Sequence, residues 1–340
     1  MRRTKILAAA LAVAALATGP ALADRFDDGQ SITYYNALNG KVVGFVPIAM
    51  GFDLTEGWLA GMQRQADALG YTIVVRDPNW NTEAGIQALG SLIAEKPDLL
   101  IVHNNDMHSY NRMVKKALDE GITVLQVNQK VTTNGDAFVG ADWYEIGVQD
   151  AKAVVKACGE GSGKFGKVAF IQGVPTSPGS AIVLQGAEDV FAEHPEIKVV
   201  ANQAADWDAT KAHAITSTIL KQHEDLCGIV GFWDGQDVGT AAAIREAGKT
   251  GEVFLVTSGG GQRAAACDNI ANGNFSTYVS YDVEGQARDL NSAIKILLQN
   301  KPEAPAGKPF ALYTPLKVFD KSTMRPDSCW TVDELKQFGG

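Results

Sequence analysis

Short runs of apolar residues alternate along the chain with longer segments in which apolar residues recur every three or four positions. The short runs are rich in β-branched residues and are typical of buried strands, whereas the longer segments are typical of amphipathic helices. In the first part of the chain, this pattern predicts strands over 41–47, 71–75, 99–102 and 123–127, and helices over 55–69, 82–94 and 109–120. Four strands separated by three helices predict a parallel sheet with helices on both faces.

The same alternation begins again near residue 143. The pattern predicts strands over 167–171, 197–200, 228–232, 253–256 and 276–279, and helices over 143–158, 180–192, 210–222, 239–247, 263–271 and 283–298. The tail beyond Lys301 contains several prolines, which favour extended connections over helix. The predicted fold class is therefore α/β, with two doubly wound parallel-sheet lobes.

The N-terminal residues have the pattern of a secretory signal peptide. Three basic residues lie among the first five, 6–17 is an unbroken apolar run, and Ala21-Leu22-Ala23 supplies the small residues of a cleavage site. A membrane anchor is the alternative, but the run is shorter than the ~20 residues that span a bilayer. We therefore expect a signal peptide over 1–23 and an exported, soluble protein that begins at Asp24.

Charge and length narrow the choice of function. The formal net charge is −9, and loss of the three basic residues of the predicted signal peptide makes it −12. An acidic surface disfavours nucleic acids and anionic membranes as partners. The remaining length is sufficient for two domains, and 46% hydrophobic residues support a substantial core. Export also disfavours roles that need cytosolic ATP, NAD or DNA.

The cysteines of an exported protein suggest disulfides, and four cysteines allow three pairings. They are Cys158, Cys227, Cys267 and Cys329, with no metal-binding spacing. We favour a bridge between Cys267 and Cys329, because it would tie the tail to a helix. The other two cysteines are either a second bridge or buried thiols.

Polar and aromatic residues gather in the loops that follow the predicted strands. Open parallel sheets bind ligands beyond the carboxyl ends of their strands, so these loops are the place to look for a site. Asp, Asn and Gln can pair with the hydroxyls of a neutral ligand, and aromatic rings can cover the apolar faces of a sugar. The candidate ligand-binding residues are Phe52, Asp53, Asn105, Asp106, Asn128, Lys130, Ser177, Trp207, Trp233, Asp234, Ser258 and Asp282.

Local structural roles compete with this interpretation. Asp and Asn at strand-to-helix junctions are common helix caps, which we expect for Asp208. Trp58 falls at a helical position beside apolar neighbours, so we expect it in the core. The glycine-rich stretch 159–164 is not a phosphate loop, because Phe165 stands where Ser or Thr should be, and 259–264 fits the dinucleotide fingerprint only loosely. Zinc-ligand spacing and a nucleophile elbow are absent from the sequence, so we expect no metal, cofactor or catalytic residue.

These segments together resemble the periplasmic sugar-binding proteins of ABC transporters, in the ribose/galactose/xylose-like type I group. The likeness runs from about Lys41 to Val318 and rests on segments such as Glu95-Lys-Pro-Asp-Leu-Leu-Ile-Val-His-Asn-Asn-Asp, Ala204-Ala-Asp-Trp-Asp and Gly231-Phe-Trp-Asp-Gly-Gln-Asp. The resemblance implies a hinge of three crossings, near 128–130, 281–282 and 310. It implies an N-terminal extension over 24–40, one lobe from 41–129 plus 283–309, and another from 130–282 plus 310–340.

The resemblance also implies roles for individual residues. Asp106 matches an aspartate that binds sugar hydroxyls, Trp207 matches an aromatic residue that stacks on the ring, and Asp234 falls where the family has an Asn-Asp pair. Phe52 and Asp53 lie in the first ligand loop, and Asp282 falls near a polar hinge residue. The chain lacks the family's Arg within 177–185 and its Phe-Asp-Gly after Val256. These departures point away from ribose and galactose, toward another pentose, a deoxy or branched sugar, or a linear polyol.

The function expected from this resemblance is capture of a monosaccharide or sugar alcohol by a periplasmic monomer that serves a membrane ABC importer. An exported carbohydrate-active enzyme is the alternative, with Asp106 and Asp234 as a carboxylate pair. A sugar-sensing receptor component is a second alternative, and a receptor-facing role is also compatible with transport. The signal peptide and the lack of a DNA-binding helix pair disfavour a cytosolic repressor of the same fold.

Overall fold

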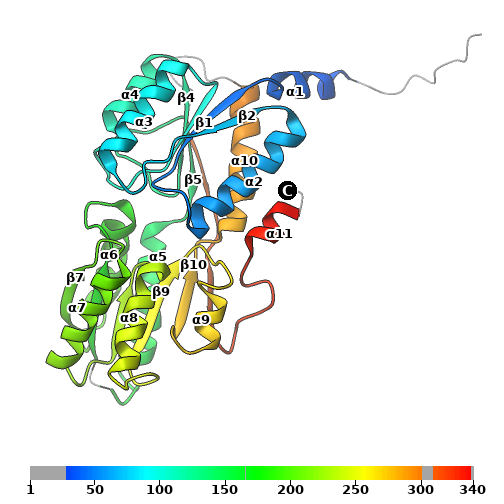
Figure 1. The fold of residues 1–340 in the computed structure, drawn as a ribbon. Helices are drawn as coiled ribbons and strands as arrows, with labels where there is room; N and C mark the ends of the chain where they lie inside the picture. The colour runs from blue at the N-terminus through cyan, green and yellow to red at the C-terminus, as the bar shows by residue number, and fades with distance from the viewer. Residues whose placement is uncertain (1–27, 165, 301–308, 338–340) are drawn as a thin grey trace, which may run out of the picture.

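The computed structural model describes residues 28–164, 166–300 and 309–337, so the predicted signal peptide lies outside the described residues. Two six-stranded sheets with helices on their faces form two lobes, one above the other in Figure 1. This arrangement confirms the predicted fold class. Among the described residues, no helix has both the length and the hydropathy that a membrane span requires.

The first sheet is parallel throughout and forms the core of lobe 1. Its strands, in spatial order, are β11 (Phe310–Tyr313), β5 (Ala137–Gly140), β4 (Thr123–Val127), β3 (Leu99–Val102), β1 (Val42–Val46) and β2 (Thr72–Val75). The helices of this lobe are α1 (Gln30–Leu38), α2 (Asp53–Leu69), α3 (Thr82–Glu95), α4 (Asn111–Asp119), α10 (Val283–Gln299) and the C-terminal α11 (Val332–Gln337). Strand β3 is buried at every position, as its unbroken apolar run predicts.

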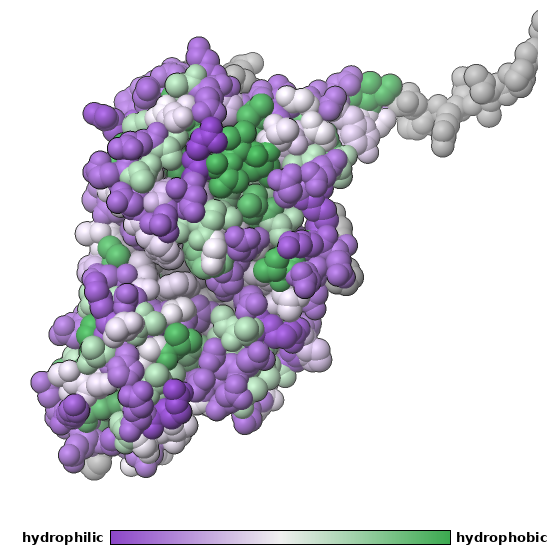
Figure 2. Space-filling view, viewed as in Figure 1, coloured by the Kyte–Doolittle hydropathy of each residue, from purple (hydrophilic) through white to green (hydrophobic). Residues whose placement is uncertain are grey.

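The second sheet forms the core of lobe 2 and has one antiparallel edge strand. Its strands, in spatial order, are β12 (Lys317–Asp320), β10 (Thr277–Ser280), β9 (Phe254–Gly259), β8 (Gly228–Gly231), β6 (Lys167–Gln172) and β7 (Lys198–Ala204). The helices are α5 (Trp143–Cys158), α6 (Pro178–Ala192), α7 (Ala209–Gln222), α8 (Asp234–Glu246) and α9 (Cys267–Ala271). Figure 2 shows mostly hydrophilic residues over the outer surface of both lobes, as expected for helices that turn their apolar faces to a sheet.

Several element boundaries differ from the predicted ones for local reasons. Helix α8 begins at Asp234, five residues before the predicted start, because its first turn holds polar residues that pack inward. Asp208 caps α7 by accepting a hydrogen bond from the amide of Lys211, as predicted. The tail does contain extended strands, but it also contains α11, which the sequence pattern did not predict.

The connections between the lobes differ from the predicted hinge. The first crossing follows β5, between Gly140 and Trp143, rather than 128–130, because β5 pairs with β4 and keeps 137–140 in lobe 1. The second crossing lies at Tyr281–Asp282. The third lies between β11 and β12 rather than at Phe310, because β11 pairs with β5 in the first sheet. The predicted lobe boundaries therefore shift at two of three crossings.

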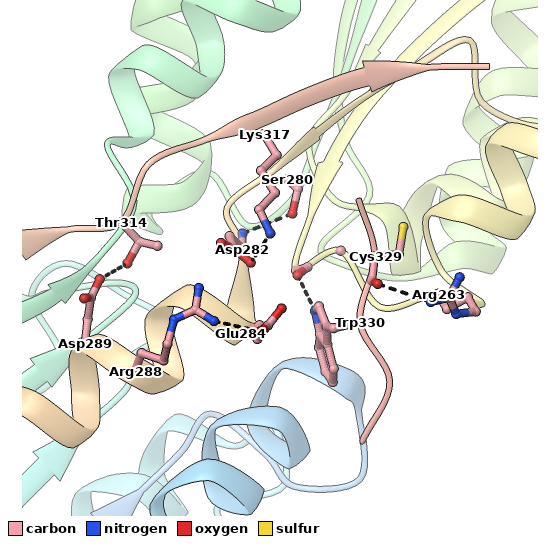
Figure 3. Close-up of polar contacts among 12 residues, drawn as sticks. Arg263, Ser280, Asp282, Glu284, Arg288, Asp289, Thr314, Lys317, Cys329 and Trp330 are labelled. Atoms are coloured by element: carbon pink, nitrogen blue, oxygen red, sulfur yellow. Dashed lines mark hydrogen bonds and ion pairs between the residues drawn. The ribbon is translucent and has the colours of Figure 1, made fainter. Parts of the chain in front are cut away.

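The C-terminal tail makes a fourth connection between the lobes (Figure 3). The Cys267–Cys329 disulfide, predicted from the sequence, ties the tail to α9 in lobe 2. Trp330 then donates a hydrogen bond from Nε1 to the carbonyl of Gly260, and α11 packs on α2 in lobe 1. Cys158 and Cys227 form a second disulfide, so of the two possibilities left open by the sequence, a second bridge or buried thiols, the structure has the bridge.

Polar side chains hold the hinge in place (Figure 3). The carboxylate of Asp282 pairs with the Lys317 ammonium at 2.9 Å, joining the second crossing to β12. The Thr314 hydroxyl donates to Asp289 at 2.7 Å, joining the third crossing to α10. These contacts link segments that are distant in sequence, so the crossings form one unit.

Candidate functional site

A cavity lies where the carboxyl ends of the two sheets face each other between the lobes. The volume open to a water-sized sphere is only about 30 Å³, well below the range for ligand pockets, so the lining side chains fill most of the space. The residues that line it come from loops after β1, β2, β3, β4, β8 and β10, from the first turns of two helices, and from the loop before α7. They are Ile48, Phe52, Leu54, Trp80, His103, Asn128, Gln129, Trp143, Trp207, Phe232, Trp233 and Tyr281.

Aromatic rings form most of the cavity wall and contact one another from both lobes. The Phe52 ring lies 5.1 Å from Trp80 within lobe 1 and 5.9 Å from Trp233 of lobe 2, between ring centroids. Trp233 also meets Trp207 edge to face at 6.2 Å. These separations are typical of favourable aromatic pairs, so the two lobes pack together through their rings.

Three lining residues have left-handed backbones that non-glycine residues rarely adopt. The φ angles are 60° at Asn128, 65° at Trp80 and 66° at Trp207. Such conformations cost roughly 1–3 kcal/mol each and cluster at functional sites. The surrounding structure holds them in place: the Trp207 amide donates to Gln236 Oε1 at 3.0 Å, and the Trp80 amide donates to the carbonyl of Ile48.

Unpaired polar atoms lie at the cavity. His103 and Asn128 line it and are each 1% exposed. Their Nδ1 and Oδ1 atoms have no hydrogen-bond partner, although Asn128 Nδ2 lies 3.4 Å from His103 Nε2. Burial lowers the pKa of His103 to about 3, so its ring is neutral. Because unpaired buried polar groups are unfavourable, these atoms are suited to pair with a ligand.

Two carboxyl groups, one in each lobe, directly follow the lining residues Phe52 and Trp233 in the sequence. Asp53 begins α2, and its Oδ2 atom is buried without a partner. Asp234 begins α8 and is 1% exposed; it accepts hydrogen bonds from the Tyr278 hydroxyl at 2.5 Å and the Gly235 amide at 2.7 Å. Burial raises the pKa of Asp53 to about 6, and burial together with the charge of Asp53 raises the pKa of Asp234 well above its usual value.

Of the residues predicted to bind ligand, the structure places Phe52, Asn128, Trp207 and Trp233 at the cavity wall, whereas Asp53 and Asp234 follow lining residues in the sequence without lining the cavity themselves. Asn105 lies beside the wall, where its Oδ1 accepts a hydrogen bond from Trp207 Nε1 across the lobes at 3.2 Å. Its amide oxygen is therefore used to join the lobes.

Five further predicted residues also lie outside the cavity lining. Asp106 Oδ1 accepts hydrogen bonds from the amides of His108 and Ser109, and Ser177 caps α6. The remaining three have other partners: the Ser258 hydroxyl donates to the carbonyl of Phe232, Asp282 pairs with Lys317, and the Lys130 ammonium lies over the Phe138 ring.

Asp106 nevertheless joins the lobes. Burial alone would raise its pKa, but hydrogen bonds from the Thr176 side chain and from its own loop lower that pKa to about 2. The Met107 amide also donates to the carbonyl of Thr176 in lobe 2, at 3.1 Å. The carboxylate expected to bind sugar is thus occupied at the lobe interface.

Sequence reasoning missed several lining residues. Trp80 lies in the loop after β2, so the tendency of ligands to bind beyond the carboxyl ends of strands could have identified it. His103 directly follows β3 and is the first residue of a loop that was already under consideration. Trp143, Phe232 and Tyr281 are nearly buried, and the sequence pattern does not distinguish them from core residues.

Buried carboxyl groups in lobe 2 lead to a pH prediction. Burial raises the pKa of Asp237 to about 7, and burial with the charge of Asp237 raises that of Asp150, whose two carboxyl oxygens have no partner. Each group favours folding below its unfolded pKa, and this contribution is lost as pH rises through the folded pKa. Since each such group contributes up to about 1.4 kcal/mol per pH unit, we expect the free energy of unfolding to fall by about 1–3 kcal/mol per pH unit from pH 5 to 7.

Urea unfolding at pH 5, 6, 7 and 8 without ligand measures this slope. The Asp150→Asn variant cannot ionise at that position, so its stability should depend less steeply on pH. A stability that rises between pH 5 and 7 in the unaltered chain would contradict the prediction.

Comparisons with known proteins agree with this architecture. The family model described as "Periplasmic binding protein domain" matches residues 43–302. The D-allose-binding periplasmic protein of Escherichia coli is 31% identical over 43% of this chain and 49% of its own length. The D-apiose import binding protein of Paraburkholderia graminis is 28% identical over 56% of this chain and 61% of its own length. The alignments thus span about half to three fifths of these relatives.

A solved structure shows the same fold over a longer range. The solute-binding protein of an ABC transporter from Burkholderia graminis, in complex with D-arabinose, has a TM-score of 0.76. It is 20% identical, and the match covers 86% of this chain and 99% of that chain. This likeness shows the fold, and the family model, which matches residues 43–302, shows that the chain belongs to the periplasmic binding protein domain family.

Proposed function

We propose that this protein captures a monosaccharide or sugar alcohol between its lobes and delivers it to a membrane ABC importer. The observation that carries the proposal is the interlobe cavity, which is lined by aromatic rings and by His103 and Asn128, whose imidazole Nδ1 and amide Oδ1 atoms are unpaired. Rings can cover the C–H faces of a sugar, and the polar atoms can pair with its hydroxyls. The relatives named above, which bind D-allose or import D-apiose, support the same ligand class.

The ligand contacts in this proposal come from both lobes. Phe52, Asp53, Trp80, His103 and Asn128 belong to lobe 1, and Trp207 and Trp233 belong to lobe 2. A ligand that contacts both sides favours the closed arrangement of the lobes, as in the hinge closure of periplasmic binding proteins generally. The Trp207–Asn105 hydrogen bond adds a direct link between the lobes in that arrangement.

The proposal includes a location and a mode of action. The protein acts in the periplasm as a monomer, after export through its N-terminal signal peptide. It binds its ligand without converting it, uses no cofactor and does not bind nucleic acid. The closed form presents both lobes to the importer.

Calorimetric titration of the purified chain with pentoses, hexoses and linear polyols tests this function. We expect one-to-one binding of at least one of them, with a higher melting temperature because the ligand binds the folded state. Chromatography of the ligand after incubation should recover it unchanged. Turnover of the ligand, or failure of every compound to bind, would contradict the proposal.

The Trp207→Ala variant should bind that ligand about 1–3 kcal/mol more weakly, because it removes a stacking surface and the hydrogen bond to Asn105. Calorimetry measures the affinity, and urea unfolding without ligand measures stability. Tyr35→Ala is the control, since Tyr35 is 54% exposed on α1, away from the cavity. Unchanged affinity together with lower stability would make Trp207 a purely structural residue.

A further inference from the structure

A second cavity lies between the lobes, beside the first and third crossings, and we call it the hinge pocket. Its volume open to a water-sized sphere is about 350 Å³, within the range for ligand pockets and far above that of the interlobe cavity. Lobe 1 contributes Met107 and residues of the loop 128–132, and lobe 2 contributes Pro178 and Ile182 of α6. The pocket therefore has room for a second molecule between the two lobes.

The hinge pocket shares a wall with the interlobe cavity, because Asn128 and Trp143 line both. Trp143 Nε1 donates a hydrogen bond to the carbonyl of Asn128 at 2.6 Å, which fixes this wall. Beside it, the Gly179 amide at the start of α6 donates to Gln129 Oε1 of lobe 1 at 3.3 Å. A molecule in the hinge pocket thus contacts both lobes while they are closed.

The surface of the hinge pocket is mostly apolar. Eight of its twelve described lining residues are apolar or aromatic. The rings of Phe138 and Tyr313, on the paired strands β5 and β11, lie 5.5 Å apart between centroids, and Tyr313 is 53% exposed. Ile182 faces the pocket from lobe 2. An apolar wall with an exposed ring favours a ligand with an aromatic or hydrocarbon part.

A single positive charge lies at this apolar wall. The Lys130 ammonium lies 5.4 Å from the centroid of the Phe138 ring, which attracts it, and it forms no ion pair with any described residue. The nearby Thr132 hydroxyl accepts a hydrogen bond from Asn111 and keeps its own hydrogen to donate. Asp142, the one acidic residue of the described lining, caps α5. The loop 130–132 is therefore suited to bind an anionic group.

We propose that the hinge pocket binds an amphipathic organic acid. Its aromatic or hydrocarbon part packs between the rings of Phe138 and Tyr313 in lobe 1 and Ile182 in lobe 2. Its carboxylate pairs with the Lys130 ammonium and accepts a hydrogen bond from the Thr132 hydroxyl. This site is distinct from the cavity to which the proposed function assigns the sugar.

Occupation of the hinge pocket should also affect the interlobe cavity. Because the bound acid contacts both lobes, it favours their closed arrangement and raises the affinity of the interlobe cavity for its own ligand. The coupling is reciprocal, so the sugar raises the affinity for the acid by the same factor. This second effect rests on the proposed function, whereas binding of the acid does not.

Three matched compounds test the site on the full chain. Calorimetry compares naphthylacetate with naphthylethanol and naphthylethylamine, which carry the same ring with a neutral or a positive end. We expect naphthylacetate to bind one-to-one and about fivefold more tightly than naphthylethanol, because it adds an ion pair with an exposed lysine. Naphthylethylamine should bind most weakly, and added salt should reduce the preference for the acid.

Two variants separate the charge from the apolar wall. Lys130→Gln should remove the preference for naphthylacetate over naphthylethanol and leave the binding of naphthylethanol unchanged. Lys115→Gln is the matched control, since Lys115 is exposed on α4 and pairs with Asp119. Ile182→Trp should fill the pocket and weaken the binding of both compounds.

The outcomes distinguish this site from the proposed function. Failure of all three compounds to bind, or the same preference for the acid in Lys130→Gln, would overturn the site. Titration of the sugar with and without saturating naphthylacetate tests the coupling, and an unchanged affinity would overturn that effect alone. If every sugar and polyol fails to bind, the proposed function falls, and the three naphthyl compounds still decide the hinge pocket.

Discussion

Replacing Trp58 with alanine is expected to lower the free energy of unfolding by about 3–5 kcal/mol. Trp58 is fully buried, as the sequence pattern predicted, on the face of α2 that packs into lobe 1. Its Nε1 donates to Gln286 Oε1 on α10 at 3.0 Å, and its ring meets His103 edge to face at 5.0 Å. Alanine would leave a large void and an unpaired buried amide oxygen, and both effects are destabilising.

The same substitution should also weaken ligand binding, because the ring of Trp58 supports His103 at the cavity. Urea unfolding measures the first effect, and calorimetry with the ligand found above measures the second. Trp58→Phe keeps most of the buried volume and should lose less stability. Trp80→Ala is the matched control, since Trp80 is 41% exposed and should affect binding far more than stability. A loss below about 1 kcal/mol for Trp58→Ala would contradict the packing account.

The alternation of strands and helices could be predicted because each element carries its own periodicity. Strand β5 was missed for a physical reason. Its four residues follow Gly135 closely and end in Gly140, and they form a strand only because β4 and β11 pair with them on either side. That pairing depends on residues 310–313, which are far away in the sequence. The positions of the first and third hinge crossings depend on the same pairing, so they could not be read from local pattern either.

The position of the cavity could be predicted from the sequence, but only some of the residues that line it could be. Strand ends do converge on the cavity, and Phe52, Trp207 and Trp233 line it. Asp106 and Ser177 are polar residues in the right loops, yet their side chains satisfy the backbone amides of those loops. Asp and Ser serve such local roles as readily as they bind ligands. Only the three-dimensional geometry distinguishes the two uses.

The backbone conformations of Trp80 and Trp207 could not be predicted from the sequence. Both have left-handed backbones, and both line the cavity. A positive φ at a tryptophan cannot be inferred from residue type, since bulky residues avoid it. The full aromatic wall, which adds Trp80, Trp143, Phe232 and Tyr281 to the predicted rings, therefore became visible only in the structure.

The two disulfides should stabilise the chain by similar amounts and yet act differently on the lobes. They join cysteines 69 and 62 residues apart, so loop closure predicts that removing either lowers the free energy of unfolding by up to about 4 kcal/mol. Cys158 and Cys227 both belong to lobe 2. Cys329, in contrast, lies in the tail that continues to α11 on lobe 1.

Removal of the Cys267–Cys329 bridge, by alanine at both positions, should therefore also loosen the fourth connection between the lobes. Hydrogen exchange of the α11 amides should become faster, because the tail would then be held only by noncovalent contacts, such as the Trp330 hydrogen bond and the contact of Arg64 with the Leu335 carbonyl. The Cys158→Ala/Cys227→Ala variant is the matched control. It should lose comparable stability in urea while α11 keeps its protection under native conditions. Equal protection of α11 in both double variants would show that packing, and not the disulfide, holds the tail across the hinge.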